Sequence, residues 1–211
     1  MPSGTARWEG GVDLQQVRAT YRDETRSAIL AAAARILSEE GPAALTVRRV
    51  AEVVNASTKM IYTCFSGKAG LLDALYIHSF DGLGREFGKC LAEPAPVARL
   101  RAICKAYRAY ALAEPAFYNV MFGDLGRAYE APLESRRRAW STFRAMREAV
   151  AACLPEDRRD EARQLSQMLW ATLHGVVSLE LRGLLGEKTD AGDLYDRTSE
   201  LFLQGSGLIP S

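Results

Sequence analysis

The sequence predicts an all-α protein with an N-terminal three-helix, helix-turn-helix unit and a larger helical part behind it. Apolar residues recur at steps of three and four through most of the 211 residues, which is the spacing of one face of a helix. Glycines, prolines and helix-capping residues fall between these periodic stretches, where helices begin and end. The patterns divide the chain into an N-terminal domain, residues 21–75, and a C-terminal domain, residues 76–211.

Composition excludes several other classes of protein. Hydrophobic residues make up 48% of the chain, which is enough for a substantial core in one or two domains. No stretch reaches the roughly 18 uninterrupted apolar residues of a membrane helix. The N-terminus also lacks the apolar core of a signal peptide. We therefore expect a cytoplasmic protein without a membrane partner.

The cysteines and histidines do not predict a metal site or a cofactor. The four cysteines are too far apart for a CxxC motif and are expected to be buried, reduced thiols. The alternative is a redox-sensor role for Cys64, which lies within the predicted recognition helix. The histidines, His78 and His174, have no acidic cluster nearby at ligand spacing.

The chain before the first helix predicts a disordered extension over residues 1–20, where three glycines and one proline interrupt any periodicity. In the alternative interpretation Arg7, Arg18 and Arg22 form an arm that reaches DNA. The first helix of the N-terminal domain follows and stops at Gly41.

The second predicted helix begins at Thr46, whose hydroxyl suits a helix N-cap. Apolar residues from Val47 to Val54 then repeat at helical spacing and form one buried stripe. At Asn55 the chain must leave this helix, and asparagine is the best substitute for glycine in a left-handed backbone conformation. A tight turn is expected there.

The third predicted helix begins after Ser57, a second N-cap, and has one apolar and one polar face. Met60, Ile61 and Phe65 are expected to point inward. The outward residues carry groups that bind phosphates and base edges. With neighbours on the flanking helices they form the candidate DNA-binding set: Thr46, Arg48, Ser57, Thr58, Lys59, Tyr62, Thr63 and Lys68.

The local charge supports this interpretation. The whole chain has a net charge of only +1, which argues against a nonspecific coating of nucleic acid. From Thr46 to Lys68, however, four basic residues stand against Glu52 alone. A limited basic patch on a nearly neutral protein is typical of a site-specific DNA reader. Arg49 fits either a phosphate contact or a solvated surface equally well.

The last two predicted helices indicate self-association. The first of these helices has two apolar stripes. One stripe includes Leu165, Leu169 and Val176, and the other includes His174 and Leu181. One stripe can meet the core of its own domain, and the other needs a partner. Together with a final helix around Phe202, two chains would form a four-helix homodimer interface. A deeply buried helix in a monomer is the alternative.

Residues 22–75 resemble the N-terminal domain of the tetracycline-repressor (TetR) family. In this family a helix that begins with a threonine is followed by a turn and then by the recognition helix. The recognition helix carries a Tyr and then a Phe, and a Lys follows three residues after the Phe. Tyr62, Phe65 and Lys68 have this spacing. The chain departs from the pattern at Asn55, Lys59 and Ala69. Because Lys59 changes what the helix can read, no operator sequence follows from the resemblance.

A second resemblance covers the C-terminal domain. Trp170, His174 and Gly175 are similar to the signature of the WHG class of TetR C-terminal domains, and PAFYNVMFG is similar to its earlier aromatic segment. The resemblance implies a domain that binds a small-molecule effector and dimerises. Residues that combine apolar bulk with polar tips are the candidates for the effector site: Tyr107, Tyr110, Phe117, Tyr118, Met121, Phe122, Phe143, Trp170 and His174.

The resemblances together imply a ligand-responsive transcriptional regulator, usually a repressor, that binds a palindromic double-stranded operator as a homodimer. An enzyme is not expected, because the sequence offers no nucleophile–base constellation, paired catalytic carboxylates, phosphate loop or metal cluster. The alternative is an all-α small-molecule-binding or adaptor protein without DNA function, which would use the third helix against another protein.

Overall fold

The computed structural model describes residues 13–123 and 129–209, and every regular element in these ranges is a helix, which confirms the all-α class. No helix in this part of the chain is long and apolar enough to cross a membrane. The elements are α1 (Leu14–Glu40), α2 (Val47–Val53), α3 (Thr58–Phe65), α4 (Lys68–Cys90), α5 (Pro96–Ala113), α6 (Pro115–Phe122), α8 (Leu133–Thr142), α9 (Arg144–Cys153), the 3-10 helix η1 (Glu156–Glu161), α10 (Ala162–Leu181) and α11 (Ala191–Gly205).

Short-range capping contacts build the helix-turn-helix unit as predicted. The Thr46 hydroxyl accepts the backbone N–H of Arg49 at 3.1 Å, and the Ser57 hydroxyl accepts that of Met60 at 3.3 Å. Asn55 has a φ of 50°, in the left-handed region, so the turn between α2 and α3 forms where the sequence predicts it. Gly41, with a φ of 84°, ends α1.

The predicted disordered extension is wrong for residues 14–20, which form the first turns of α1. The Asp13 side chain caps this helix by accepting the backbone N–H groups of Gln15 and Gln16. Residues 14–20 also lack glycine and proline, so nothing in them opposes a helix once it is capped. Arg18 and Arg22 are exposed on these turns, whereas residues 1–12, with Arg7, lie outside the described residues.

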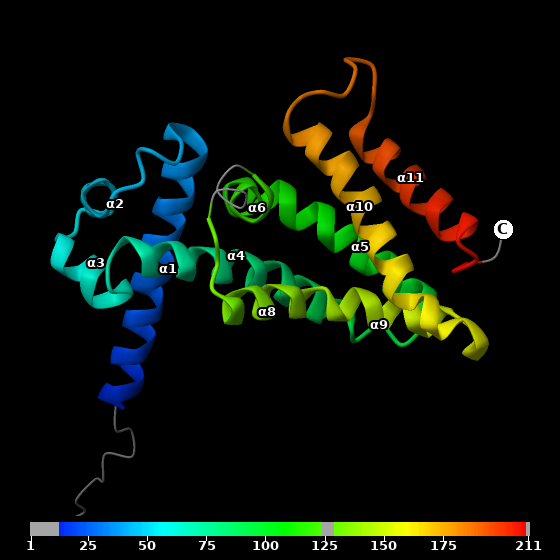
Figure 1. The fold of residues 1–211 in the computed structure, drawn as a ribbon, viewed down its shortest axis with the longest axis horizontal. Helices are drawn as coiled ribbons and strands as arrows, with labels where there is room; N and C mark the ends of the chain where they lie inside the picture. The colour runs from blue at the N-terminus through cyan, green and yellow to red at the C-terminus, as the bar shows by residue number, and fades with distance from the viewer. Residues whose placement is uncertain (1–12, 124–128, 210–211) are drawn as a thin grey trace, which may run out of the picture.

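Helix α4 contributes to two hydrophobic cores. Its first half places Leu71 and Leu75 in a core with α1, α2 and α3, and both side chains are fully buried. Its second half places Leu83 and Phe87, also fully buried, in a core with α5, α9 and α10. Figure 1 shows α4 running from the small N-terminal unit beneath the C-terminal helices. The domain division after residue 75 therefore falls inside one continuous helix.

The C-terminal helices pack as a bundle with α10 and α11 on one side. α10 and α11 lie side by side, as Figure 1 shows in orange and red. The Arg108 guanidinium of α5 binds the Glu180 carboxylate of α10 at 2.6 and 2.9 Å. On α11, the Tyr195 hydroxyl donates to the backbone carbonyl of Cys104 at 2.6 Å. These contacts fix the last two helices against α5.

The thiols differ in their surroundings. Cys104 is buried, and its burial raises the thiol pKa to about 12, so it is an unreactive core residue. Cys64, Cys90 and Cys153 are only half-buried, so the expectation of buried thiols is wrong for these three. The described residues contain no disulfide partner for any of the four.

Replacing Gly82 by Ala is expected to destabilise the protein by about 1–3 kcal/mol, because a Cβ there would lie 2.5 Å from the Tyr110 hydroxyl. Tyr110 would have to leave its hydrogen bond to the Ser79 carbonyl. Gly88→Ala on the same helix is the matched control, since its Cβ meets nothing within 4 Å and helix propensity favours alanine. Thermal unfolding should separate the two variants; equal melting temperatures would contradict this packing.

Candidate DNA-binding interface and effector site

The outward face of α3 carries the polar residues that the sequence predicts there. Thr58, Lys59, Tyr62 and Thr63 are exposed, whereas Ile61 and Phe65 are buried. The inward placement of Met60 is wrong, because its side chain is 37% exposed. In a helix of eight residues the i and i+4 pair of Ile61 and Phe65 already fills the narrow buried face. Met60 therefore adds an apolar group to the exposed surface.

Tyr62 is oriented by a glycine that the sequence analysis missed. Gly67 has a φ of 104°, and a Cβ at this position would lie 3.2 Å from the Tyr62 ring. The ring therefore lies against a backbone without a side chain, while Tyr62 stays 57% exposed. Lys68 follows as the first residue of α4 and is also exposed. The structure thus brings Tyr62 and Lys68 together at the junction of α3 and α4.

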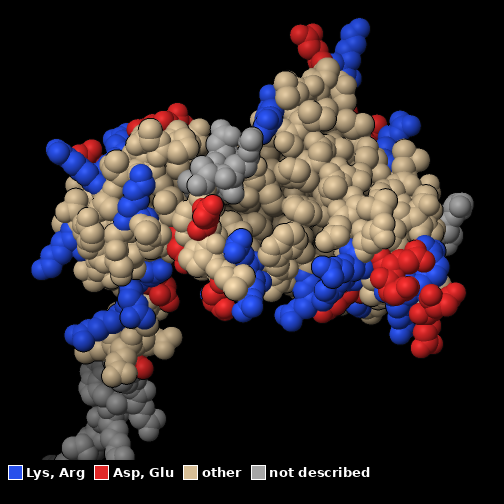
Figure 2. All heavy atoms as spheres, viewed as in Figure 1, with Lys and Arg blue, Asp and Glu red and all other residues tan. Residues whose placement is uncertain are grey.

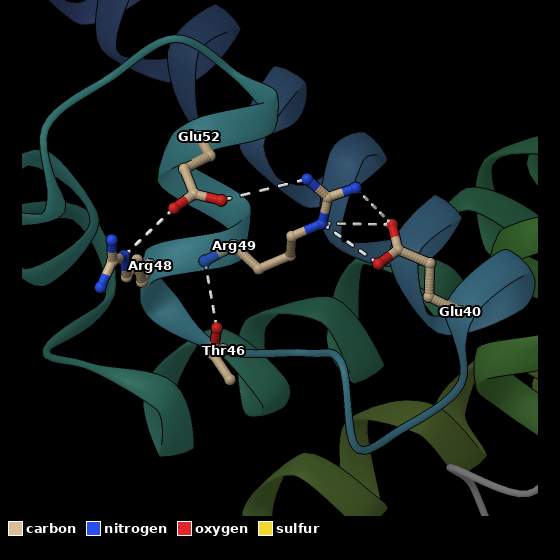
Figure 3. A network of polar contacts seen from close by, with 5 residues as sticks. All are labelled: Glu40, Thr46, Arg48, Arg49 and Glu52. Carbon is tan, nitrogen blue, oxygen red and sulfur yellow. Dashed lines mark hydrogen bonds and ion pairs between the residues drawn. The ribbon is translucent and has the colours of Figure 1, made fainter.

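The two arginines of α2 have different surroundings (Figure 3). Arg48 is 86% exposed, and its Nε atom lies 3.1 Å from the Glu52 carboxylate one turn on. Arg49 instead binds Glu40 at the end of α1 with two nitrogens, at 2.7 and 3.1 Å. Its hydrogen bond lowers the pKa of the Glu40 carboxyl. Arg49 therefore holds α2 to α1, and Arg48 extends into solvent.

The N-terminal unit presents basic side chains over its surface. Figure 2 shows Lys and Arg projecting from this unit, at the left of the view, with fewer acidic groups between them. Thr46 and Ser57 are exposed at the starts of α2 and α3, although their hydroxyls already accept the capping N–H groups. All eight candidate DNA-binding residues thus lie on or beside α2, α3 and the first turn of α4.

Arg26 of α1 fixes the far end of α3 through a contact that the sequence pattern does not predict. Its guanidinium donates to the backbone carbonyl of Cys64 and lies 4.3 Å from the centre of the Phe65 ring. The carbonyl is one of the unpaired groups at a helix C-terminus, where a positive charge is also favourable. Arg26 therefore anchors the recognition helix to α1.

A chain of hydrogen bonds joins four of the predicted effector-site residues. Trp170 donates its Nε1–H to the Tyr107 hydroxyl at 3.2 Å. The Tyr107 hydroxyl lies 3.1 Å from that of Tyr118. The Tyr118 hydroxyl in turn lies 2.7 Å from Nδ1 of His174. These four residues come from α5, α6 and α10, so the tertiary fold assembles a polar relay inside an aromatic region.

The other predicted effector-site residues divide into two groups. Phe122 and Phe143 pack around Trp170, with ring centres 5.7 and 4.7 Å away. Tyr110 instead donates to the Ser79 carbonyl, and Phe117 packs on His78 of α4 at 5.0 Å. Met121 is buried in the core. The structure therefore places Tyr110, Phe117 and Met121 as packing residues that take no part in the hydrogen bonds of the relay.

A recess of about 270 Å³ opens at the relay, between the end of α1, α6 and α10. Three of the candidate effector-site residues, Tyr118, Phe122 and His174, line it. Its other polar residues were missed by the sequence analysis, because they lie on three separate elements: Ser38, Asn119, Ser178 and Arg182. Burial and the Arg182 charge both lower the pKa of His174, which keeps the ring neutral near pH 7.

Two family models match the chain. One, described as bacterial regulatory proteins of the tetR family, matches residues 29–75, which include α2 and α3. The other, described as a tetracyclin repressor-like C-terminal domain, matches residues 100–202, which include Trp170 and His174. The chain belongs to the TetR family. The TetR resemblance inferred from Tyr62, Phe65 and Lys68 is thereby confirmed.

Relatives and solved structures agree with this family. The chain is 22% identical over 219 residues to the HTH-type transcriptional regulator Rv1816 of Mycobacterium tuberculosis (strain ATCC 25618 / H37Rv), covering 88% of this chain and 94% of that protein. SCO4313, a protein assigned a regulatory role, has a TM-score of 0.75 and 26% identity, covering 88% and 98% of the two chains. The TetR family regulator PfmR of Thermus thermophilus has a TM-score of 0.64 and 19% identity, covering 83% and 97%.

The TetR assignment gives the general function. The chain is a DNA-binding transcriptional regulator, and the matched families are regulators rather than enzymes. Among the residues placed by the structure, no group of three His, Cys, Asp or Glu side chains is arranged to hold a metal ion. TetR regulators bind DNA, dimerise and respond to small-molecule effectors.

Arg26→Met is expected to lower the free energy of unfolding of the TetR N-terminal unit by about 1–3 kcal/mol, because it removes a charged hydrogen bond and a cation–π contact. Arg22→Met, one turn earlier on the exposed face of α1, should change it by less than about 0.5 kcal/mol. Hydrogen exchange of the α3 amides measures the difference. Equal protection in the two variants would show that Arg26 does not anchor α3.

Proposed function

We propose that the protein is a ligand-responsive repressor, which a small molecule releases from a palindromic operator. The observation that carries this proposal is the continuity of α4. One end of this helix bears Lys68 and packs beneath α3, while its second half is buried against α5. A rigid helix that shares both cores can transmit a shift in the C-terminal bundle to the DNA-binding surface.

The mechanism is a shift between two populations. An effector that binds between α6 and α10 favours one arrangement of the bundle, and α4 moves with it. The separation of the two recognition helices in a dimer then changes, and operator affinity falls. For a tenfold fall the effector needs a preference of only about 1.4 kcal/mol for the non-binding arrangement.

The outer face of α10 and α11 supports the proposed homodimer. On α10, Met168, Ala171, Gly175 and Leu179 are exposed and recur at steps of three and four. Leu201 of the adjacent helix α11 is 67% exposed. An exposed apolar stripe on α10, with Leu201 on its neighbour, fits a symmetric four-helix interface. Such a dimer would present two recognition helices about one DNA turn apart to a palindrome in the cytoplasm.

The DNA-binding residues are tested by the affinity of the purified protein for its own upstream intergenic DNA across a salt series. Tyr62→Ala and Lys68→Ala should each weaken binding about tenfold or more, and Lys68→Ala should reduce the salt slope by about 0.9. The matched control is Lys188→Ala, at an exposed position between α10 and α11.

If the affinity of the wild type for DNA does not change with salt concentration, the protein does not contact several phosphates, because such contacts release counterions. That outcome would favour the second candidate, an all-α adaptor or small-molecule-binding protein that uses α3 against another protein. The exposure of both Met60 and Tyr62 on α3 is the observation that favours it, since each presents apolar surface.

The dimer is tested by Ala171→Asp, which places a carboxylate in the middle of the exposed stripe on α10. Burying this charge against the partner is unfavourable, so the protein should sediment as a monomer at concentrations where the wild type is a dimer. Arg197→Asp, on the solvated side of α11, should leave the dimer intact. A dimer that survives Ala171→Asp would place the interface elsewhere.

A further inference from the structure

The recess between α1, α6 and α10 offers hydrogen-bond donors and positive charge. We propose that its ligand is a small organic acid, whose oxyanion is bound by Arg182 and His174 and whose apolar part lies on Phe122 and Leu181. This inference rests on the proposed function as an effector-responsive regulator and names the chemical class of the effector.

The direction of the relay fixes which nitrogen of His174 carries the proton. An indole N–H only donates, so the Tyr107 hydroxyl accepts from Trp170, and its own buried proton can go to the Tyr118 hydroxyl at 3.1 Å or to Nδ1 of His174 at 3.3 Å. In the first case the Tyr118 hydroxyl donates to Nδ1 at 2.7 Å, and in the second Tyr107 donates to it. Because Nδ1 accepts, a neutral ring carries its proton on Nε2.

This proton is directed at the recess. The Nδ1 edge of the ring faces the two buried tyrosines, and the ring also lines the recess. No described residue accepts a hydrogen bond from Nε2, and no described side-chain nitrogen or oxygen is both buried and unpaired. The Nε2 atom is therefore open to the recess and available as a donor to a ligand.

The charge in the recess is of one sign. Arg182 is the charged residue among those that line it, and no acidic side chain of the described ranges lies within 4.0 Å of its guanidinium. The charge reaches the ring, because it lowers the pKa of His174. The Asn119 amide and the Ser178 hydroxyl supply further donors at the wall. Donors beside an arginine favour an oxyanion.

The size of the recess limits the ligand. Its volume of about 270 Å³ is just below the range of roughly 300–1,000 Å³ that holds drug-sized ligands. A long acyl chain or a large polycyclic compound would extend beyond this space. Phe122, Leu181 and Pro115 give an apolar wall for a short aliphatic or single-ring group.

The position of the recess supplies a second route to the DNA-binding unit. Ser38 belongs to the last turn of α1 and lines the recess, so a bound ligand touches α1 directly. Two residues on, Glu40 binds Arg49 of α2, as Figure 3 shows. An acid held between Arg182 and Ser38 would therefore act on the helix end that positions α2, in addition to its effect through α4.

Three probes of one skeleton test the charge preference with the full-length protein: phenylacetate, 2-phenylacetamide and 2-phenylethylamine, measured by isothermal titration calorimetry. The wild type should bind the acid at least about tenfold more tightly than the amide or the amine. In Arg182→Glu the order should reverse, with the amine bound best. Hexanoate, hexanamide and hexylamine repeat the series for an aliphatic group.

The control is Arg137→Glu, which makes the same charge change at an exposed position of α8, away from the recess, and should keep the wild-type order. Because Arg182 is itself exposed at the end of α10, its replacement should leave the fold intact, which thermal unfolding checks. Equal binding of acid and amide by the wild type, no binding of either acid, or acid binding that survives Arg182→Glu would each overturn the proposal.

Operator affinity measured on the same samples separates the two proposals. Protein that binds DNA with the expected salt dependence but shows no Arg182-dependent acid binding would refute the acid site and leave the regulator standing. Protein that binds acids through Arg182 but shows no salt-dependent affinity for DNA would support the acid site and refute the proposed function.

Discussion

The structure depends on α4 as one continuous helix buried in two cores. Leu71 and Leu75 pack with α1, α2 and α3, and Leu83 and Phe87 pack with α5, α9 and α10. The start of α4 packs closely against the end of α3 because residue 70 is a glycine. An added Cβ at Gly70 would lie 1.8 Å from the Phe65 carbonyl oxygen. Neither core can shift freely without α4, so the DNA-binding surface and the effector region are mechanically connected.

Elements that depend on neighbouring residues could be predicted from the sequence. The Thr46 and Ser57 caps bond to N–H groups three residues away, and Asn55 ends α2 through its own backbone preference. The two wrong predictions in this part of the chain also concern neighbouring residues. Asp13 comes directly after a glycine-rich stretch, which predicts a later start for α1 than the structure shows. Helical periodicity predicts an inward Met60 because it does not show how narrow the buried face is.

Contacts between distant parts of the chain could not be predicted. Arg26 meets a carbonyl 38 residues away, and Tyr118 meets His174 at a separation of 56. The aromatic pattern did select the four relay residues, because large polar-tipped side chains are common in ligand sites. It could not separate them from Tyr110, which has the same chemistry but donates to Ser79 in the core. The hydrogen-bond partner of each tyrosine hydroxyl decides whether the residue belongs to the relay or to the core. That partner is known only from the fold.

In the proposed mechanism, the relay lies at the effector end of the signal and the Glu40–Arg49 ion pair at the DNA-binding end. Buried polar groups must be paired, so the bonds from Trp170 to His174 hold the ring in one orientation and leave one donor for a ligand. At the other end, Glu40 and Arg49 form a solvent-exposed pair, and such pairs contribute little to stability. The buried Val50 and Ala51 therefore hold α2 in the N-terminal core, and the Glu40–Arg49 pair adds a contact that a shift at the end of α1 can change at little cost.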